Sequence, residues 1–152
     1  MKTKKILALI LAAALALSLA ACGSAQTSKD KDGLIKVGIV NNPPSESGYR
    51  AANVADFEKV FSEANGYKVS TFYSLKNDEQ LNAAQQFITD GVDYLLISAA
   101  ATDGWTNVLE NAKKAGVKVF LFDRMMNVDQ SLFEAAVISN MEAQGRMAVQ
   151  WL

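Results

Sequence analysis

The sequence predicts an α/β protein built around a doubly wound parallel sheet. Four apolar runs of strand length alternate with three segments in which apolar residues recur at helical spacing. Helices between parallel strands act as right-handed crossovers and cover both faces of the sheet. Solenoid repeats would also give regularly alternating segments, but these segments share no residue pattern beyond the β-α alternation.

The first strand is expected at residues 35–40, which are apolar on both faces except for Lys36. Such a run is typical of a strand buried inside a parallel sheet. The Asn-Asn-Pro-Pro segment at 41–44 ends it, because proline lacks the N–H that a strand ladder uses. Gly66 is placed to end the helix that follows. The apolar stripe of that helix comprises Val54, Phe57, Val60, Phe61 and Ala64.

The second strand is expected at about 68–73. Asn77 or Asp78 can cap the next helix, because a short polar side chain accepts hydrogen bonds from free amides at a helix start. Gly91 closes this helix. Its apolar stripe comprises Leu81, Ala84, Phe87 and Ile88.

The third strand is expected at 94–98 and the fourth at 117–122. Between them the pattern predicts a helix over about 105–115, which Gly116 ends. Two further elements are expected near the C-terminal end, a short strand at 136–139 and a helix at 142–152.

The N-terminus has the features of a lipoprotein signal peptide. Lysines precede an apolar stretch over 6–21, which ends in Leu-Ala-Ala immediately before Cys22, the single cysteine. Cleavage removes residues 1–21 and leaves Cys22 to carry a lipid, with a flexible spacer over 22–33. The protein is therefore expected outside the cytoplasm, held on the bacterial cell membrane through this lipid anchor only.

Two other interpretations of this segment are weaker. An uncleaved transmembrane anchor needs about twenty apolar residues, and the stretch over 6–21 is shorter. Cys22 could instead be a free thiol that seeks a disulfide partner, but its position at the signal boundary argues against that role.

Composition excludes several functional classes. Removal of residues 1–21 leaves twelve basic against sixteen acidic residues, a net charge near −4 that argues against a nucleic-acid partner. The chain has no histidine and its one cysteine is assigned to the lipid, so no metal site, cofactor or catalytic residue is expected. Ser47 lacks the G-x-S-x-G elbow, and the loop after the first strand lacks both glycine-rich phosphate motifs. An exported α/β enzyme is therefore a minor alternative.

Ligands of open parallel sheets bind at the carboxyl ends of the strands. Polar and aromatic residues follow three of the predicted strands, and they are the candidate ligand-binding residues: Glu46, Ser47, Tyr49, Arg50, Trp105, Asp123 and Arg124. Carboxylates accept hydrogen bonds from sugar hydroxyls, guanidinium groups donate to them, and aromatic rings pack against the C–H face of a sugar. This combination favours a neutral polyhydroxylated ligand.

Each candidate also has a structural explanation. Asp123 and Arg124 could form a solvated ion pair that merely ends a strand. Tyr49 and Trp105 could pack the first turns of their helices into the core. Arg50 could be an exposed helix residue, and Glu46 could serve only the helix dipole.

Four motifs together resemble those of a known family. They are Glu-Ser-Gly-Tyr-Arg-Ala-Ala-Asn at 46–53, Phe-Ile-Thr-Asp-Gly-Val-Asp at 87–93, Asp-Gly-Trp at 103–105 and Phe-Leu-Phe-Asp-Arg at 120–124. In this order after a lipoprotein signal they resemble the type I periplasmic sugar-binding proteins of ABC importers, and within them the galactofuranose-binding branch. The resemblance runs from about Ile35 to Leu152.

The resemblance implies a monomeric receptor whose two lobes close on a monosaccharide and which then docks on an ABC importer permease. Asp123 and Arg124 would match the pair that binds sugar hydroxyls, and Tyr49 and Arg50 the aromatic and arginine of the first loop, with Trp105 beside them. A galactofuranose-like or galactose-like sugar is expected, although Tyr49 stands where the family often has tryptophan. A sensory module that presents sugar to a chemoreceptor or kinase is the alternative, while export excludes a repressor of this fold.

The same resemblance implies a division of the chain. Residues 34–139 would form the N-terminal sugar-binding lobe, and 140–152 the hinge crossing and the start of a second lobe. Because such receptors are about twice this long, a truncated chain is expected. A half-site lacks the contacts of the second lobe, so the chain alone is expected to bind sugar weakly or not at all.

Overall fold

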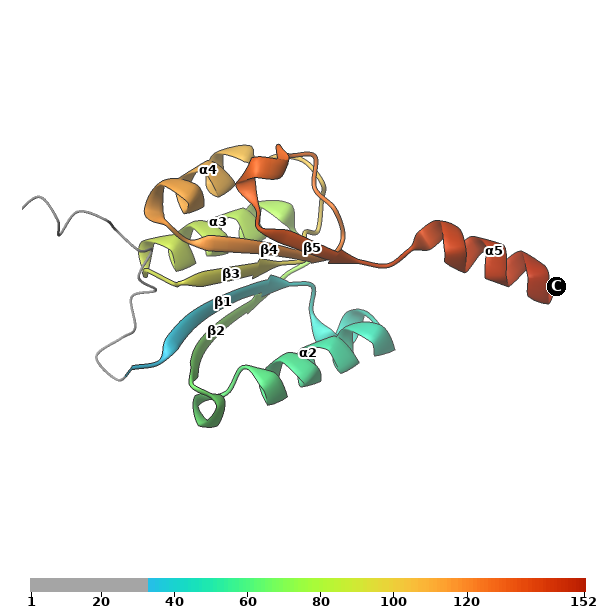
Figure 1. Ribbon diagram of the computed structural model, residues 1–152, viewed down its shortest axis with the longest axis horizontal. Coiled ribbons are helices and arrows are strands. Elements are labelled where there is room, and N and C mark those ends of the chain that lie inside the picture. Colours follow the sequence, from blue (N-terminus) through green and yellow to red (C-terminus); the bar gives the residue numbers. More distant parts are fainter. Residues whose placement is uncertain (1–32) are drawn as a thin grey trace, which may run out of the picture.

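A computed structural model describes residues 33–152 and shows a five-stranded parallel sheet (Figure 1). The strand order is β2-β1-β3-β4-β5, so the order reverses between β1 and β3, as in doubly wound folds. The fold class predicted from the sequence is confirmed. The predicted signal peptide, and the spacer apart from Gly33, lie outside the described residues. The strands are β1 (Ile35–Asn41), β2 (Tyr67–Tyr73), β3 (Tyr94–Ile97), β4 (Lys118–Asp123) and β5 (Ala135–Ile138).

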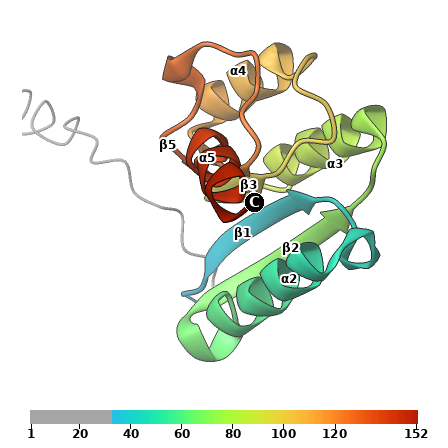
Figure 2. The ribbon, with the colours of Figure 1, turned by 90° about the vertical axis from the view of Figure 1, so that its right-hand side faces the viewer.

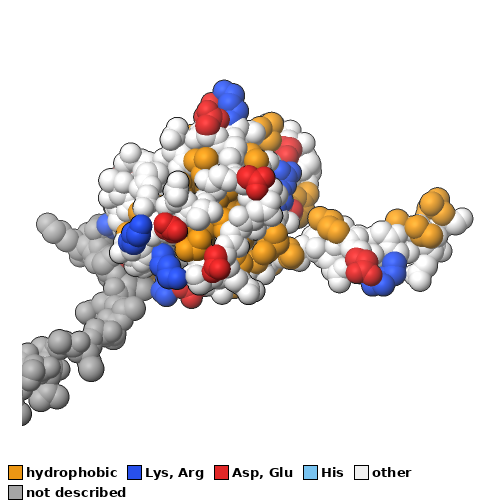
Figure 3. Space-filling model, turned by 90° about the horizontal axis from the view of Figure 1, so that it is seen from above, with side chains coloured by type: hydrophobic (Ala, Val, Ile, Leu, Met, Phe, Trp, Pro, Cys, Tyr) orange, Lys and Arg blue, Asp and Glu red, His pale blue; other side chains and the backbone are white. Residues whose placement is uncertain are grey.

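The helices cover the two faces of the sheet unequally. Among residues 33–152, α2 (Gly48–Val60) is the only helix on one face, whereas α3 (Asn77–Thr89) and α4 (Thr106–Ala115) pack side by side on the other (Figure 2). Helix α5 (Met141–Trp151) extends beyond the end of the sheet and stands clear of the rest of the molecule (Figure 3). Within the described range, no helix is long and apolar enough to cross a membrane.

The main core lies between the sheet and the α3-α4 layer. Its largest fully buried side chains include Leu95 and Leu109, and strands and helices contribute to one continuous apolar cluster. Gly38 of β1 is required here, because a Cβ at this position would lie 2.8 Å from the ring of Phe87 on α3. The β1 backbone can therefore approach α3 closely only without a side chain.

The opposite face has a smaller core and an open groove. Phe57 of α2 packs edge-on against Phe122 of β4 with 5.0 Å between ring centroids. Beyond α2 the sheet surface is uncovered, and Val137 of β5 is 76% exposed. The resulting groove, of about 480 Å³, is lined by Val37, Tyr49, Asn53, Phe57, Phe61, Tyr67, Tyr94, Leu96, Phe120, Leu121, Phe122, Asp123 and Val137.

Two helix ends differ from the sequence-based expectation. Helix α2 stops at Val60, and Gly66 instead ends a short 3-10 turn (Glu63–Asn65) in the left-handed conformation. The side-chain amide of Asn65 donates to the carbonyl groups of Lys59 and Val60, which satisfies the end of α2 early. Val60 is consequently exposed rather than buried.

The start of α3 is the second difference. Lys76 occupies the cap position and no side chain caps the helix, so the expectation for Asn77 or Asp78 is wrong. The amide of Asn77 instead donates to the carbonyl of Asp103, 3.1 Å away in the loop before α4. This bond ties α3 to the next strand-end loop.

Candidate functional site

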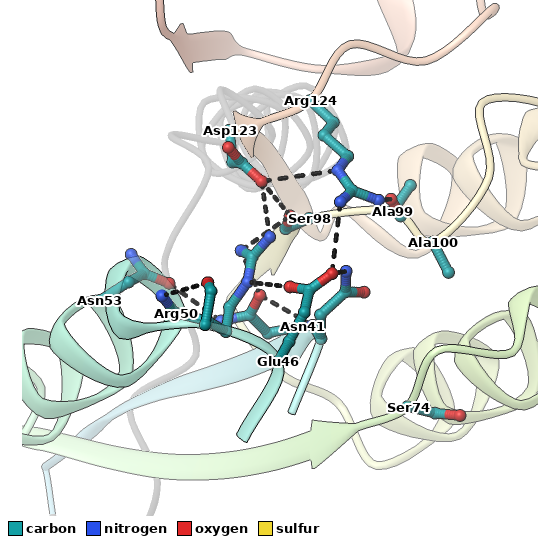
Figure 4. Close-up of polar contacts among 12 residues, drawn as sticks. Asn41, Glu46, Arg50, Asn53, Ser74, Ser98, Ala99, Ala100, Asp123 and Arg124 are labelled. Atoms are coloured by element: carbon teal, nitrogen blue, oxygen red, sulfur yellow. Dashed lines mark hydrogen bonds and ion pairs between the residues drawn. The ribbon is translucent and has the colours of Figure 1, made fainter. Parts of the chain in front are cut away.

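A buried guanidinium group forms the centre of a polar cluster at the carboxyl ends of β1, β3 and β4 (Figure 4). Arg50, in the first turn of α2, is only 2% exposed, so it is not the exposed helix residue considered above. It donates to Asp123 Oδ2 at 2.6 Å, Asn41 Oδ1 at 2.8 Å, Ser98 Oγ at 3.2 Å and Glu46 Oε2 at 3.1 Å. Four of its five N–H donors are therefore engaged within the protein.

Asp123 is held in an unusual backbone conformation. It ends β4 with φ 65°, and it is the only non-glycine residue with positive φ in the described chain. Its Oδ2 atom accepts from Arg50 and from the hydroxyl of Ser98. No hydrogen bond to its Oδ1 atom is present among the described residues, which leaves one carboxylate oxygen as a free acceptor in a fixed position. Such conformations persist where the surroundings enforce them, and they cluster at functional sites.

Arg124 contrasts with Arg50 because its contacts are long and its side chain is partly exposed. Its nitrogens lie 3.5 Å from the carbonyl of Ala99, 3.5 Å from Glu46 Oε1 and 3.6 Å from Asp123 Oδ2. These distances are at or beyond the limit of a good hydrogen bond. The Arg124 guanidinium can therefore turn toward a ligand at little cost, whereas Arg50 is locked.

Glu46 connects the two arginines. Its carboxylate accepts from Arg50 and from the amide of Asn42 at 2.9 Å. Burial raises the pKa of Glu46, but the hydrogen bonds from Arg50 and Asn42 and the two nearby positive charges outweigh burial and hold this pKa below its usual value. We call Glu46, Arg50, Asp123 and Arg124 the rim cluster; with two carboxylates and two guanidinium groups its formal charge is zero.

The first turn of α2 places the remaining two candidates of this loop. Ser47 is the N-cap residue, and its hydroxyl accepts a hydrogen bond from the backbone N–H of Arg50. It thereby fixes the start of the helix that carries Arg50. Tyr49 is 55% exposed, so the alternative that it packs into the core is wrong, and the guanidinium carbon of Arg50 lies 5.4 Å from its ring centroid. Its ring is available to a ligand beside the rim cluster.

The expectation that Trp105 faces a sugar is wrong. It is fully buried in the α3-α4 core, and its indole N–H donates to the carbonyl of Ala101 at 3.0 Å. The ring therefore has no free face, and the alternative that it packs the start of α4 into the core is the one that the structure supports. A large aromatic ring with a satisfied N–H stabilises a core strongly.

Buried amides and hydroxyls that the sequence analysis did not select support the rim cluster. Asn41 and Asn42 were interpreted as strand-ending residues, yet both are fully buried and hold Arg50 and Glu46. Ser98, at the end of β3, bonds both Arg50 and Asp123. The signal that could have found all three is their position directly at strand ends.

Gln80 of α3 links several strand-end loops. This fully buried amide donates to the carbonyl of Ser74 at 2.8 Å and to Asn42 Oδ1 at 3.2 Å, and it accepts from the backbone N–H of Ala100 at 2.8 Å. Its spacing of four residues from Ala84 places it on the buried stripe of α3, which is a detectable sequence signal for a polar residue that faces inward.

The rim cluster carries side chains of the types that bind hydroxyl groups. It offers a carboxylate acceptor at Asp123, a partly exposed donor at Arg124 and an aromatic face at Tyr49. The described residues contain no group of three or more metal-ligating side chains. The acceptor, donor and aromatic ring of this rim are groups that can contact a neutral ligand with hydroxyls.

Comparison with known proteins places the chain in a family. The sequence model of a protein family described as the periplasmic binding protein domain matches residues 37–152. The fructose import binding protein of Bifidobacterium longum is 34% identical over 140 residues, which are 90% of this chain and 42% of that protein. The galactofuranose-binding protein of Escherichia coli is 37% identical over 112 residues, covering 71% of this chain and 34% of the relative.

A solved structure shows the same architecture. A Mycobacterium smegmatis protein in complex with β-D-fucofuranose superposes with a TM-score of 0.71 at 29% identity, over 77% of this chain and 38% of that protein. The chain thus spans less than half the length of the curated relatives it matches. Because the matched domain covers residues 37–152, which are most of the sequence, the chain belongs to the periplasmic binding protein family.

Proposed function

We propose that this chain is the sugar-recognising part of an extracytoplasmic binding protein that captures a monosaccharide and delivers it to an ABC importer permease. The observation that carries the proposal is the free Oδ1 acceptor of Asp123, which Arg50 and Ser98 hold in place through Oδ2. A preorganised acceptor loses little entropy when it binds a hydroxyl. Arg124 supplies a donor on the same rim.

The electrostatics of the rim cluster favour a neutral ligand. Its two positive and two negative side chains already form ion pairs, so a charged ligand would have to break them. Hydroxyl groups can be added to such a cluster without a charge imbalance. The names of two relatives refer to sugars in the furanose form, which supports a galactofuranose-like sugar over a charged solute.

Tyr49 is proposed as the stacking residue of the site. It is the exposed ring next to the rim cluster, and the apolar C–H face of a sugar packs well on such a surface. Glu46 and Arg50 are proposed to act mainly as positioning residues, with one N–H of Arg50 left for a ligand. Ser47 is proposed to contribute through the helix start that it caps.

The proposed anchor fits this role. Cys22 would hold the protein on the outer side of the bacterial cell membrane, and residues 22–33 would let it reach a permease. Import is favoured over presentation to a sensor, because one relative is named as an import binding protein. The division into a lobe over 34–139 and the start of a second lobe over 140–152 is part of the same proposal.

Titration of the full chain with methyl galactofuranoside, followed through backbone amide signals in NMR, tests this function. We expect weak, saturable shifts at Asp123 and Arg124, and we expect Arg124→Ala to abolish them, because it removes the mobile donor without touching a buried group. Glu58→Ala, on an exposed position of α2, is the matched control and should keep the shifts. The proposal fails if no sugar shifts the rim residues or if Arg124→Ala binds like the unmodified chain.

A further inference from the structure

Gln80 is a fully buried amide whose orientation is fixed by the backbone. Its Oε1 accepts from the N–H of Ala100 at 2.8 Å, and its Nε2 donates to the carbonyl of Ser74 at 2.8 Å. A backbone N–H can only donate and a backbone carbonyl can only accept, so exchanging the two ends of the Gln80 amide would break both bonds. The segments that follow β2 and β3 therefore decide which way this side chain faces.

The orientation of Gln80 determines that of Asn42, which is also fully buried. Gln80 Nε2 donates to Asn42 Oδ1 at 3.2 Å. A reversed Asn42 would place one N–H2 group against another, and buried donors without a partner are costly. The Nδ2 atom of Asn42 therefore faces the other way and donates to Glu46 Oε1 at 2.9 Å.

The Asn42 amide meets the rim cluster at one oxygen of Glu46. This Oε1 atom also lies 3.5 Å from a guanidinium nitrogen of Arg124, whereas Oε2 accepts from Arg50 (Figure 4). A reversed Asn42 would turn its own Oδ1 toward the carboxylate, and the two oxygens would repel each other. Glu46 would then move away or take up a proton, and Arg124 would lose one of its two carboxylate contacts.

We propose that Gln80 is a positioning residue of the sugar site, which acts through Asn42 to hold the Glu46 carboxylate beside Arg124. Gln80 comes from α3 on the side of the sheet away from α2, and Asn42 links it to the rim cluster. The consequence for sugar binding rests on the proposed function. The effect on Glu46 does not, because it can be measured without a ligand.

Titration of the full chain, followed by NMR, tests this path without any substitution. As Glu46 takes up a proton, the side-chain N–H2 signals of Asn42 and Gln80 should shift with the midpoint of the Glu46 carboxyl signal, because each hydrogen bond polarises the next. The side-chain N–H2 of Asn65, at the end of α2, is the control and should not follow that midpoint. Asn42 and Gln80 signals that do not follow the Glu46 midpoint would overturn the proposal.

Two substitutions separate positioning from stability. Gln80→Met keeps an unbranched side chain but cannot donate to Asn42, so the pKa of Glu46 should rise toward its ordinary value of 4.5. Asn42→Ala should raise this pKa as well, and the double variant should raise it no further than Asn42→Ala alone, because Gln80 acts through Asn42. Ile88→Ala, at a buried position of the same helix, is the control for lost stability and should leave the pKa unchanged.

An unchanged pKa of Glu46 in Gln80→Met, or single effects that add in the double variant, would overturn the proposal. The titration of the unmodified chain decides if a buried substitution prevents folding. Methyl galactofuranoside should bind Gln80→Met several-fold more weakly than the unmodified chain, and equal affinity would overturn the assignment to the sugar site. Absence of sugar-induced shifts in the unmodified chain would refute the proposed function alone, since the Glu46 measurements need no sugar.

Discussion

The two faces of the sheet are covered by helices to different degrees. The face under α3 and α4 is closed and contains the large core with Trp105, whereas the face under α2 contains a small aromatic cluster and the open groove. The same strands serve both faces, because alternate residues of a strand point to opposite sides. Adjacent residues of one strand therefore differ sharply in how much they contribute to stability.

The rim cluster lies at the carboxyl ends of the strands, where the open face and the closed face of the sheet meet. Arg50 comes from α2 on the open side, while Ser98 and Asp123 end strands that are anchored in the closed core. The closed face thus fixes the positions of the polar groups, and the open side leaves Tyr49 and Arg124 accessible. Rigidity and accessibility are supplied by different layers of one fold.

Leu95 and Leu96, neighbours in β3 that face the closed and the open side, give the largest expected contrast. Leu95→Ala should lower the free energy of unfolding by about 2–5 kcal/mol, because it leaves a cavity in a closed core. Leu96→Ala should cost about 1 kcal/mol, since its side chain is already partly exposed. Urea unfolding of both variants checks the difference, and equal losses would mean that the two faces are equally packed.

The next contrast is in the stability lost when either of two polar side chains, Gln80 or Asn53, is removed. Gln80→Ala removes a fully buried amide that donates to the Ser74 carbonyl and to Asn42 Oδ1 and accepts from Ala100 N–H, and should cost about 1–3 kcal/mol. Asn53→Ala on α2 removes the acceptor for the amide of Asn41 at a half-buried position, and should cost about 0.5–1 kcal/mol because water can take its place.

Thermal unfolding of the Gln80 and Asn53 variants decides between these expectations. A Gln80→Ala variant as stable as Asn53→Ala would argue that the strand-end loops are held by the backbone alone. It would then remove the reason to treat the closed face as the support of the site.

The smallest expected effect is on the stability of the fold at low pH. Burial alone would raise the pKa of Glu46, but Arg50, Asn42 and Arg124 together lower it, so ionised Glu46 favours the folded state. That contribution is complete above the ordinary carboxyl pKa of 4.5 and is lost as the pH falls through the lower pKa of the folded state. Glu46→Gln should therefore flatten the decline of the melting temperature below about pH 4.5. Parallel declines in both proteins would contradict this role.

Local sequence patterns were sufficient for the sheet, and they indicated two of the loops that carry the candidate site residues. The apolar runs that became β1, β3 and β4 are recognisable because a strand buried on both faces has no polar alternation. Asp123 and Arg124 were selected because they follow such a run directly. The position of a glycine predicted the helix end correctly at Gly116 but not at Gly66, where the Asn65 side chain caps the carbonyl groups at the end of α2.

The roles of individual side chains could be predicted less well from the sequence pattern. Trp105 and Tyr49 both stand at helix starts beside a strand end, and nothing local separates them. Their exposures differ because α4 packs beside α3 in a closed layer, whereas no other helix of the described residues lies beside α2. The same reason explains Arg50, whose burial depends on four partners from distant parts of the chain.

The sequence by itself determined the class of fold, the rim that is proposed to bind a ligand and the polar residue types present there. These properties depend on periodicity and on residues adjacent in the chain. Only the tertiary structure decided which arginine is buried with short hydrogen bonds and which is partly exposed with long contacts, which aromatic ring is exposed, and that the described residues leave part of one sheet face open. Those properties depend on contacts between residues far apart in the sequence, such as Arg50 with Asp123, which no local pattern records.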